Sequence, residues 1–214
     1  MRLSSKKIVL ALAAMLVASS SASAMVLWDQ SVITPAGAAI PNSNSPGFGG
    51  FVAHSVNDVT VPASGWHVTK ISEWYGFFNS SWTGITQGFI YVQPKTGGLP
   101  TIAPVAVQSP MSAALDPAQS ALLGQSVLKV SANVNLNLSA GDYWIGITPS
   151  ASAGINGANL QWPSAQVGDA VATYQSGAWS HPASLGNEDG AFLIEGDVTV
   201  PVTPATWGSI KSLY

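Results

Sequence analysis

Nucleophilic catalysis needs a serine or cysteine held beside a base, and this sequence shows no such pair. The chain has no cysteine and no G-x-S-x-G motif. Its three histidines are His54, His67 and His181, and none has the spacing typical of zinc ligands. We expect His67 on a solvated strand face and His181 in a loop. The sequence therefore predicts neither a catalytic dyad nor a three-histidine metal site.

Paired carboxylates would suit glycoside hydrolysis, but spacing selects no pair. Glu73 is the most interesting candidate, since aromatic residues surround it in the sequence. We expect it to point outward from a strand, with a catalytic acid as the alternative. The carboxylates considered are Asp29, Asp58, Glu73, Asp142, Asp169, Glu188, Asp189, Glu195 and Asp197.

Three oxygen-bearing side chains, Asn187, Glu188 and Asp189, precede Gly190. Ca²⁺ prefers such ligands on loops, so this stretch is a speculative calcium site. The alternative is an ordinary turn, because Asn, Asp and Gly tolerate turn geometry. No other cofactor is expected.

Tryptophans beside Asn, Gln, Ser or Gly suggest a further chemistry, which is stacking against sugar rings. The speculative sugar-binding residues are Trp74, Trp82, Trp162 and Trp179. The alternative is that a chain with few charges fills its core and anchors its loops with large aromatic side chains.

The N-terminus predicts that the protein carrying these residues is exported. Arg2, Lys6 and Lys7 precede an apolar run over residues 8–17, and Ala22-Ser23-Ala24 resembles a signal-peptidase site. We expect residues 1–24 to be a cleaved signal peptide. The apolar run is too short to span a bilayer, so we expect no transmembrane segment in the mature chain. The expected destination is the periplasm, the cell surface or the extracellular space.

The charge balance limits the partners. Removing Arg2, Lys6 and Lys7 leaves four of the seven basic residues against ten acidic ones, a net charge of −6. Nucleic-acid binding needs clustered Lys and Arg, and anionic membrane surfaces attract the same residues. We expect neither partner, and we expect glycans or other surface and matrix proteins instead.

Residues 25–200 show the pattern of an all-β domain, with short apolar runs separated by turn residues. Residues 127–138 alternate strictly between apolar and polar, which predicts a strand with one buried face. We expect this strand to form a hairpin with residues 143–147. Asp116 and Pro117 predict a short helical turn within residues 113–123. The expected architecture is a single antiparallel β-sandwich of about eight to ten strands, jelly-roll-like rather than immunoglobulin-like.

Several short motifs resemble a loose group of bacterial secreted proteins. They are residues 27–29 (LWD), 57–62 (NDVTVP) followed by Trp66, 97–100 (GGLP), 138–144 (LSAGDYW) and 191–196 (AFLIEG). The group has an acidic residue where this chain has Asn57. The resemblance implies a β-sandwich on an exported or cell-surface protein, and it implies no catalytic residue.

The chain ends in a Pro/Thr spacer, residues 201–206, and an apolar tail, residues 207–214. The tail resembles short TWGxIKxLY endings of other exported bacterial proteins. Thr206 is a plausible N-cap, and Trp207, Ile210, Leu213 and Tyr214 then form one stripe of a two-turn helix. Such a short helix needs a surface. That surface is either the domain itself or an anchoring or sorting partner.

Three functions remain after these considerations. The favoured one is a non-enzymatic structural or interaction module of the cell surface or extracellular space. The alternative is a carbohydrate-binding domain that uses exposed Trp and Tyr side chains, and the third is a hydrolase.

Overall fold

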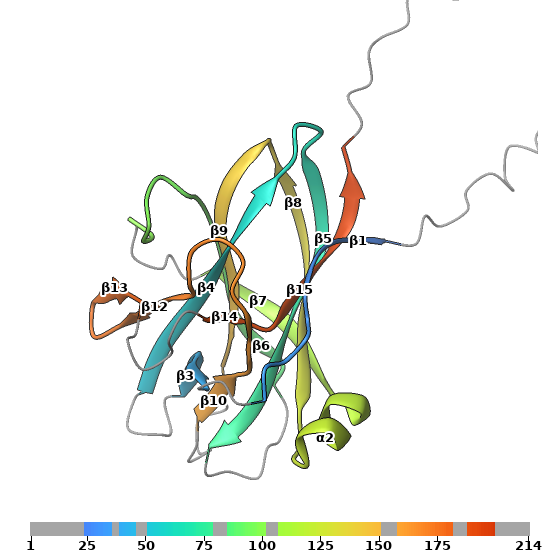
Figure 1. Ribbon diagram of the computed structural model, residues 1–214, viewed down its shortest axis with the longest axis vertical. Coiled ribbons are helices and arrows are strands. Elements are labelled where there is room, and N and C mark those ends of the chain that lie inside the picture. Colours follow the sequence, from blue (N-terminus) through green and yellow to red (C-terminus); the bar gives the residue numbers. More distant parts are fainter. Residues whose placement is uncertain are drawn as a thin grey trace, which may run out of the picture.

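The computed structural model describes residues 24–35, 39–45, 51–78, 85–101, 107–150, 158–181 and 188–199 (Figure 1). These residues form β-strands almost throughout, as the turn-separated apolar runs predicted. The strands are β1 Met25–Gln30, β2 Ile40–Pro41, β3 Ser43–Ser45, β4 Phe51–Val61, β5 Trp66–Phe78, β6 Gln87–Pro94, β7 Val107–Leu115, β8 Leu128–Leu138, β9 Gly141–Pro149, β10 Ala158–Gln161, β11 Pro163–Ala165, β12 Ala172–Gln175, β13 Ala178–Ser180, β14 Glu188–Gly190 and β15 Phe192–Val198.

One large antiparallel sheet contains most of these strands, in the order β1-β15-β5-β8-β7-β6-β9-β4-β12-β13. Strands β2, β3 and β10 attach to it beside this path, and β11 and β14 form a separate two-stranded sheet. The all-β class is therefore confirmed.

Strand β8 has the expected alternation. Leu128, Val130 and Ala132 are buried, whereas Asn133 and Asn135 on the opposite face are exposed. The side chains of a strand alternate between its two faces, so the sequence pattern alone placed this strand correctly.

The predicted hairpin between β8 and β9 is wrong. Strand β8 pairs with β5 and β7, whereas β9 pairs with β4 and β6. The short turn after Leu138 therefore joins two strands that lie in different parts of the sheet. The turn after Val61 does the same for β4 and β5, and Gly65 in that turn has a φ of +72°, which glycine adopts without strain.

The predicted helical turn is confirmed as α2, Pro117–Leu123. Asp116 is its N-cap, and the Asp116 Oδ1 atom accepts a 3.0 Å hydrogen bond from the Gln119 backbone N–H. Gly124 ends the helix in the left-handed conformation, with a φ of +66°. Residues 113–115, which the prediction included, belong to β7 instead.

The largest hydrophobic core lies between these distant parts of the sheet. Its buried side chains include Val68 and Ile71 of β5, Val130 of β8, and Ile145 and Ile147 of β9. Side chains of β5 and β8 thus share one core with side chains of β9, a strand that pairs with neither of them.

Candidate functional site

Trp74 is a core residue in this structure, since its side chain is 4 % exposed. Its Nε1–H donates a 2.8 Å hydrogen bond to Asp116 Oδ2, and Lys129 Nζ lies 4.9 Å from its ring centroid. The ring therefore anchors the α2 region and has no open face for a sugar.

The other predicted sugar-binding tryptophans do not converge. Trp162 is half-buried beside Trp74 and packs against the same small apolar cluster. Trp179 is half-buried against a different cluster, which contains Trp144, and Trp82 lies outside the described residues. The structure therefore brings Trp74 and Trp162 together and leaves Trp179 in another place.

The speculative calcium residues lie in and before β14. Asp189 is fully buried, and its Oδ2 atom accepts hydrogen bonds from Gln30 Nε2 and the Val167 backbone N–H, both at 2.7 Å. Burial raises the pKa of Asp189 to about 6. Glu188 is half-buried, and Asn187 lies outside the described residues, among which no group of three metal-ligating side chains occurs. Asp189 instead links Gln30 of β1 and the backbone at Val167 to β14 by hydrogen bonds.

Glu73 is fully buried, so the prediction of an outward strand carboxylate is wrong. A register shift between Val68 and Lys70 places Ile71, Glu73 and Tyr75 on the core side of β5. Burial raises the pKa of Glu73 to about 8, because removal from water disfavours the charged form.

The hydrogen bonds that Glu73 accepts lower its pKa, but by less than burial raises it. Glu73 Oε1 accepts from the Ile147 backbone N–H at 2.9 Å, and Glu73 Oε2 lies 2.5 Å from Tyr75 Oη. Tyr75 Oη also lies 2.8 Å from the Ile147 carbonyl oxygen, but a phenol has one proton. Tyr75 therefore donates its single proton either to Glu73 Oε2 or to the Ile147 carbonyl oxygen.

This network continues toward the outer face of the sheet through Asn42. Asn42 Nδ2 lies 3.1 Å from Glu73 Oε2, and Asn42 Oδ1 accepts a 2.7 Å hydrogen bond from Thr148 Oγ1. Thr148 Oγ1 in turn lies 3.1 Å from His54 Nδ1, which also contacts Tyr91 Oη at 2.8 Å. The buried carboxyl is thus linked by side chains to His54.

His54 belongs to a row of aromatic side chains beside a second buried cluster, which contains Val56, Tyr91 and Trp144 and is separate from the main core. It pairs with Tyr174 across β4 and β12, and Tyr174 pairs with Trp179 across β12 and β13. The ring centroids are 6.5 Å apart for His54 and Tyr174, 5.3 Å for Tyr174 and Trp179, and 5.9 Å for His54 and Phe89 of β6. We call Phe89, His54, Tyr174 and Trp179 the aromatic row.

The aromatic row is partly open to solvent. Phe89, Tyr174 and Trp179 are half-buried, whereas His54 is 8 % exposed. Val52, two residues before His54 on the same face of β4, is 43 % exposed and extends the apolar surface. Burial lowers the pKa of His54 to about 4, so the row is uncharged at neutral pH.

An ion-pair cluster lies on the same side of the sheet. Lys95 Nζ contacts Asp58 Oδ2 and lies 2.9 Å from Asp169 Oδ2, while its charge sits 4.9 Å from the centroid of the Trp144 ring. Asp58 is 8 % exposed. The cluster ties the loop after β6 to residues 167–169, because Asp58 Oδ2 also accepts from the Asp169 backbone N–H.

His67 and His181 lie in the environments predicted from the sequence, a strand face and a loop. His67 is half-buried on the polar face of β5 and lies 2.8 Å from Asn135 Oδ1. His181 is exposed after β13, and its two ring nitrogens contact the carbonyl oxygens of Val171 and Gly98.

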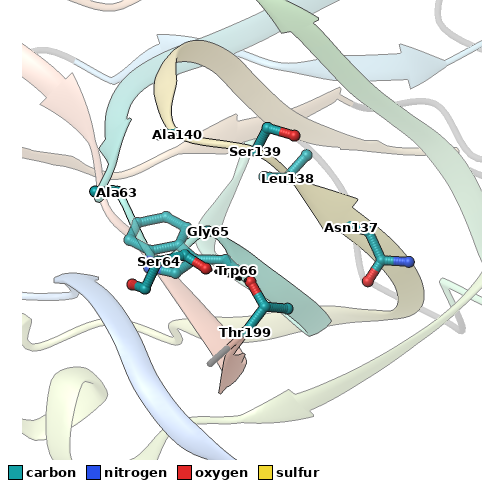
Figure 2. Close-up of a pocket in the computed structure, with 9 residues that line it drawn as sticks. All are labelled: Ala63, Ser64, Gly65, Trp66, Asn137, Leu138, Ser139, Ala140 and Thr199. Atoms are coloured by element: carbon teal, nitrogen blue, oxygen red, sulfur yellow. Dashed lines mark hydrogen bonds between the residues drawn. The ribbon is translucent and has the colours of Figure 1, made fainter. Parts of the chain in front are cut away.

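A pocket of about 310 Å³ lies at the end of the molecule where the two short turns meet (Figure 2). Thr199 forms one side of it, and its hydroxyl donates to the Ser64 carbonyl oxygen at 2.5 Å. Trp66 lies at its base and is 3 % exposed. The other lining residues are Ala63, Gly65, Asn137, Leu138, Ser139 and Ala140. The pocket holds no titratable side chain, so it offers hydroxyl, amide and backbone groups alone.

Several expectations lie outside the described residues. These are the signal peptide up to residue 23, the spacer at 201–206 and the tail residues Trp207, Ile210, Leu213 and Tyr214. Within the part of the chain that the structure describes, no helix has the length and apolar character to cross a membrane.

Sequence reasoning missed three members of the aromatic row, Phe89, His54 and Tyr174. Period-two alternation in residues 87–93 was a signal for Phe89, since it separates Phe89 and Tyr91 from Ile90 and Val92. The pairing of Tyr174 with Trp179 is local, because β12 and β13 form a hairpin, but its pairing with His54 of β4 joins residues more than a hundred positions apart and left no signal in the sequence.

Comparison with protein-family models, with curated proteins and with solved structures finds no match for this chain.

Proposed function

We propose that this chain is an exported, non-catalytic β-sandwich module that acts at the cell surface or outside the cell by binding a partner. The observation that carries the proposal is the aromatic row, in which side chains from β6, β4, β12 and β13 meet on one face of the sheet. Half-buried aromatic side chains gathered on one surface are characteristic of binding sites.

The connections of the sheet support the sandwich part of this proposal. Strands β4 and β5, and likewise β8 and β9, are joined by short turns without pairing. Each turn therefore carries the chain from one side of the main core to the other. We propose that β1, β15, β5, β8 and β7 form one layer and that β6, β9, β4, β12 and β13 form the second.

The non-catalytic role is supported by what the unusual titratable groups do. Glu73, Asp189 and His54 have strongly shifted pKa values, which is a feature of many active sites. Here each of them is engaged by side-chain or backbone groups of the same chain. Burial, which disfavours the charged form of each group, causes these shifts.

Export and surface location remain part of the proposal and rest on the sequence of residues 1–24. The resemblance to bacterial secreted proteins points the same way. The partner is then a molecule met outside the cytoplasm, either a surface protein or a glycan.

A retention assay tests this proposal. The full chain is expressed with its own N-terminus in a bacterial host, and cell-bound and released protein are quantified. We expect Phe89→Ala combined with Tyr174→Ala to move the protein from the cell-bound fraction to the medium. Leu122→Ala serves as a control on the exposed face of α2, where Leu122 is 66 % exposed. Equal retention of the double variant and the wild type would refute binding through the aromatic row.

A further inference from the structure

We infer that the aromatic row binds an uncharged polysaccharide, with pyranose rings stacked on Tyr174, Trp179 and Phe89. This inference rests on the proposed function and names the ligand class of the same surface. It differs from the sequence-based prediction, since Trp179 belongs to the row whereas the other two described tryptophans of that prediction, Trp74 and Trp162, do not.

The charge of the surface selects a neutral ligand. Every side chain of the aromatic row is uncharged at neutral pH, including His54. Lys95, which lies against Trp144 on the same side of the sheet, is already engaged by Asp58 and Asp169. A charged polymer would therefore lose hydration at this surface without gaining a counter-charge, which costs free energy.

The geometry suits a chain of sugar rings. The row crosses β6, β9, β4, β12 and β13, and adjacent strands lie about 4.8 Å apart, so it is about 19 Å long. Neighbouring ring centroids along it are 5.3 to 6.5 Å apart, a distance comparable to the width of a pyranose ring. One saccharide chain laid across the strands can thus contact successive side chains.

Hydrogen-bonding groups flank the row, as sugar hydroxyls require. Gln87 is exposed and lies two residues before Phe89 on the same face of β6. Within the described residues, the hydrogen-bond contacts of His54 are made through Nδ1. The neutral imidazole and the amide can each serve hydroxyl groups at the edge of a stacked sugar.

A peptide strand is a poorer fit for this surface. Strand addition uses the free backbone groups of a sheet edge. The edge strand next to the row is β13, which has three residues, so few backbone hydrogen bonds are available. The face of the sheet, where the side chains gather, is the larger surface.

Stacking on an aromatic ring favours sugars with a particular orientation of their ring substituents. A pyranose with equatorial substituents carries its C–H bonds on both flat faces, so it packs well on an aromatic ring. We therefore expect a β-linked glucan to bind and an α-1,6-linked dextran to bind weakly.

Affinity electrophoresis of the full chain in gels with hydroxyethyl cellulose, mixed-linkage β-glucan or dextran tests the inference. We expect retardation by the β-linked polymers. Tyr174→Ala should weaken binding about tenfold, in proportion to one lost aromatic contact, whereas Tyr174→Phe should bind like the wild type. Leu122→Ala is the matched surface control. Equal binding by Tyr174→Ala and the wild type would overturn the inference.

A titration of the wild-type protein needs no variant. Addition of the β-glucan should change the tryptophan fluorescence, since Trp179 lies in the row. If neither assay detects a polysaccharide while cell retention still depends on Phe89 and Tyr174, the sugar ligand is refuted and the binding module stands. If retention is independent of these residues as well, the proposed function also fails.

Discussion

Replacing Glu73 by glutamine should abolish most of the pH dependence of stability between pH 6.5 and 8. The pKa of Glu73 is raised from 4.5 to about 8 in the folded state, so the folded protein binds this proton more tightly than the unfolded chain. The resulting stabilisation is fully present below pH 4.5 and is lost as the pH rises to 8.

The magnitude follows from the width of the pH interval. Asp189 has a folded-state pKa of about 6, so its contribution changes little above pH 6.5. The pKa of His54 is lowered from 6.5 to about 4, so its contribution still rises by a few tenths of a kcal/mol above pH 6.5, which is small and opposite in sign to the effect of Glu73. Between pH 6.5 and pH 8, the titration of Glu73 alone should lower the free energy of unfolding by about 2 kcal/mol, since one pH unit corresponds to about 1.4 kcal/mol per proton.

Denaturant unfolding at four pH values between 6.5 and 8 measures this effect. We expect the wild type to lose about 2 kcal/mol and Glu73→Gln to remain nearly constant, because the amide mimics the neutral carboxyl. Glu195→Gln is the control, since it removes a carboxylate from the outer face of β15 and leaves Glu73 intact. A wild type and a Glu73→Gln variant with the same pH slope would refute a neutral Glu73.

Three further substitutions test other contacts. Asp116→Ala removes both the N-cap of α2 and the acceptor of the Trp74 indole, so the free energy of unfolding should fall by about 1 to 2 kcal/mol in thermal unfolding. Lys95→Met leaves Asp58 buried without its cation and should cost about 2 to 3 kcal/mol by denaturant titration; an unchanged midpoint would contradict this. Gly190→Ala would place a Cβ 2.1 Å from Gln161 Nε2, so we expect the melting temperature to fall by about 4 to 8 °C. An unchanged melting temperature would show that the Gln161 side chain moves aside without cost.

The sequence correctly predicted a strand that has one buried and one exposed face. Alternation in residues 128–138 separated buried Leu128 and Val130 from exposed Asn133 and Asn135. The cap signals at Asp116 and Pro117 likewise located α2. These features depend on local geometry, which a short stretch of sequence contains.

Features that depend on pairing between distant strands were not predictable in this way. The turn after Leu138 has the composition of a hairpin turn, but its two strands pair elsewhere. The direction of Glu73 was misjudged because a register shift in β5 changes which side chains face inward. The aromatic row is assembled from four strands, so no single segment contains it.

Hydrogen–deuterium exchange of the full chain, free and bound to the surface of bacterial cells that express it, tests the central claim most directly. We expect slower amide exchange in the bound state within residues 87–94 and 172–180, which carry most of the aromatic row. Protection confined to the opposite face, in residues 128–138, or no protection in any described strand, would contradict a binding site at the aromatic row.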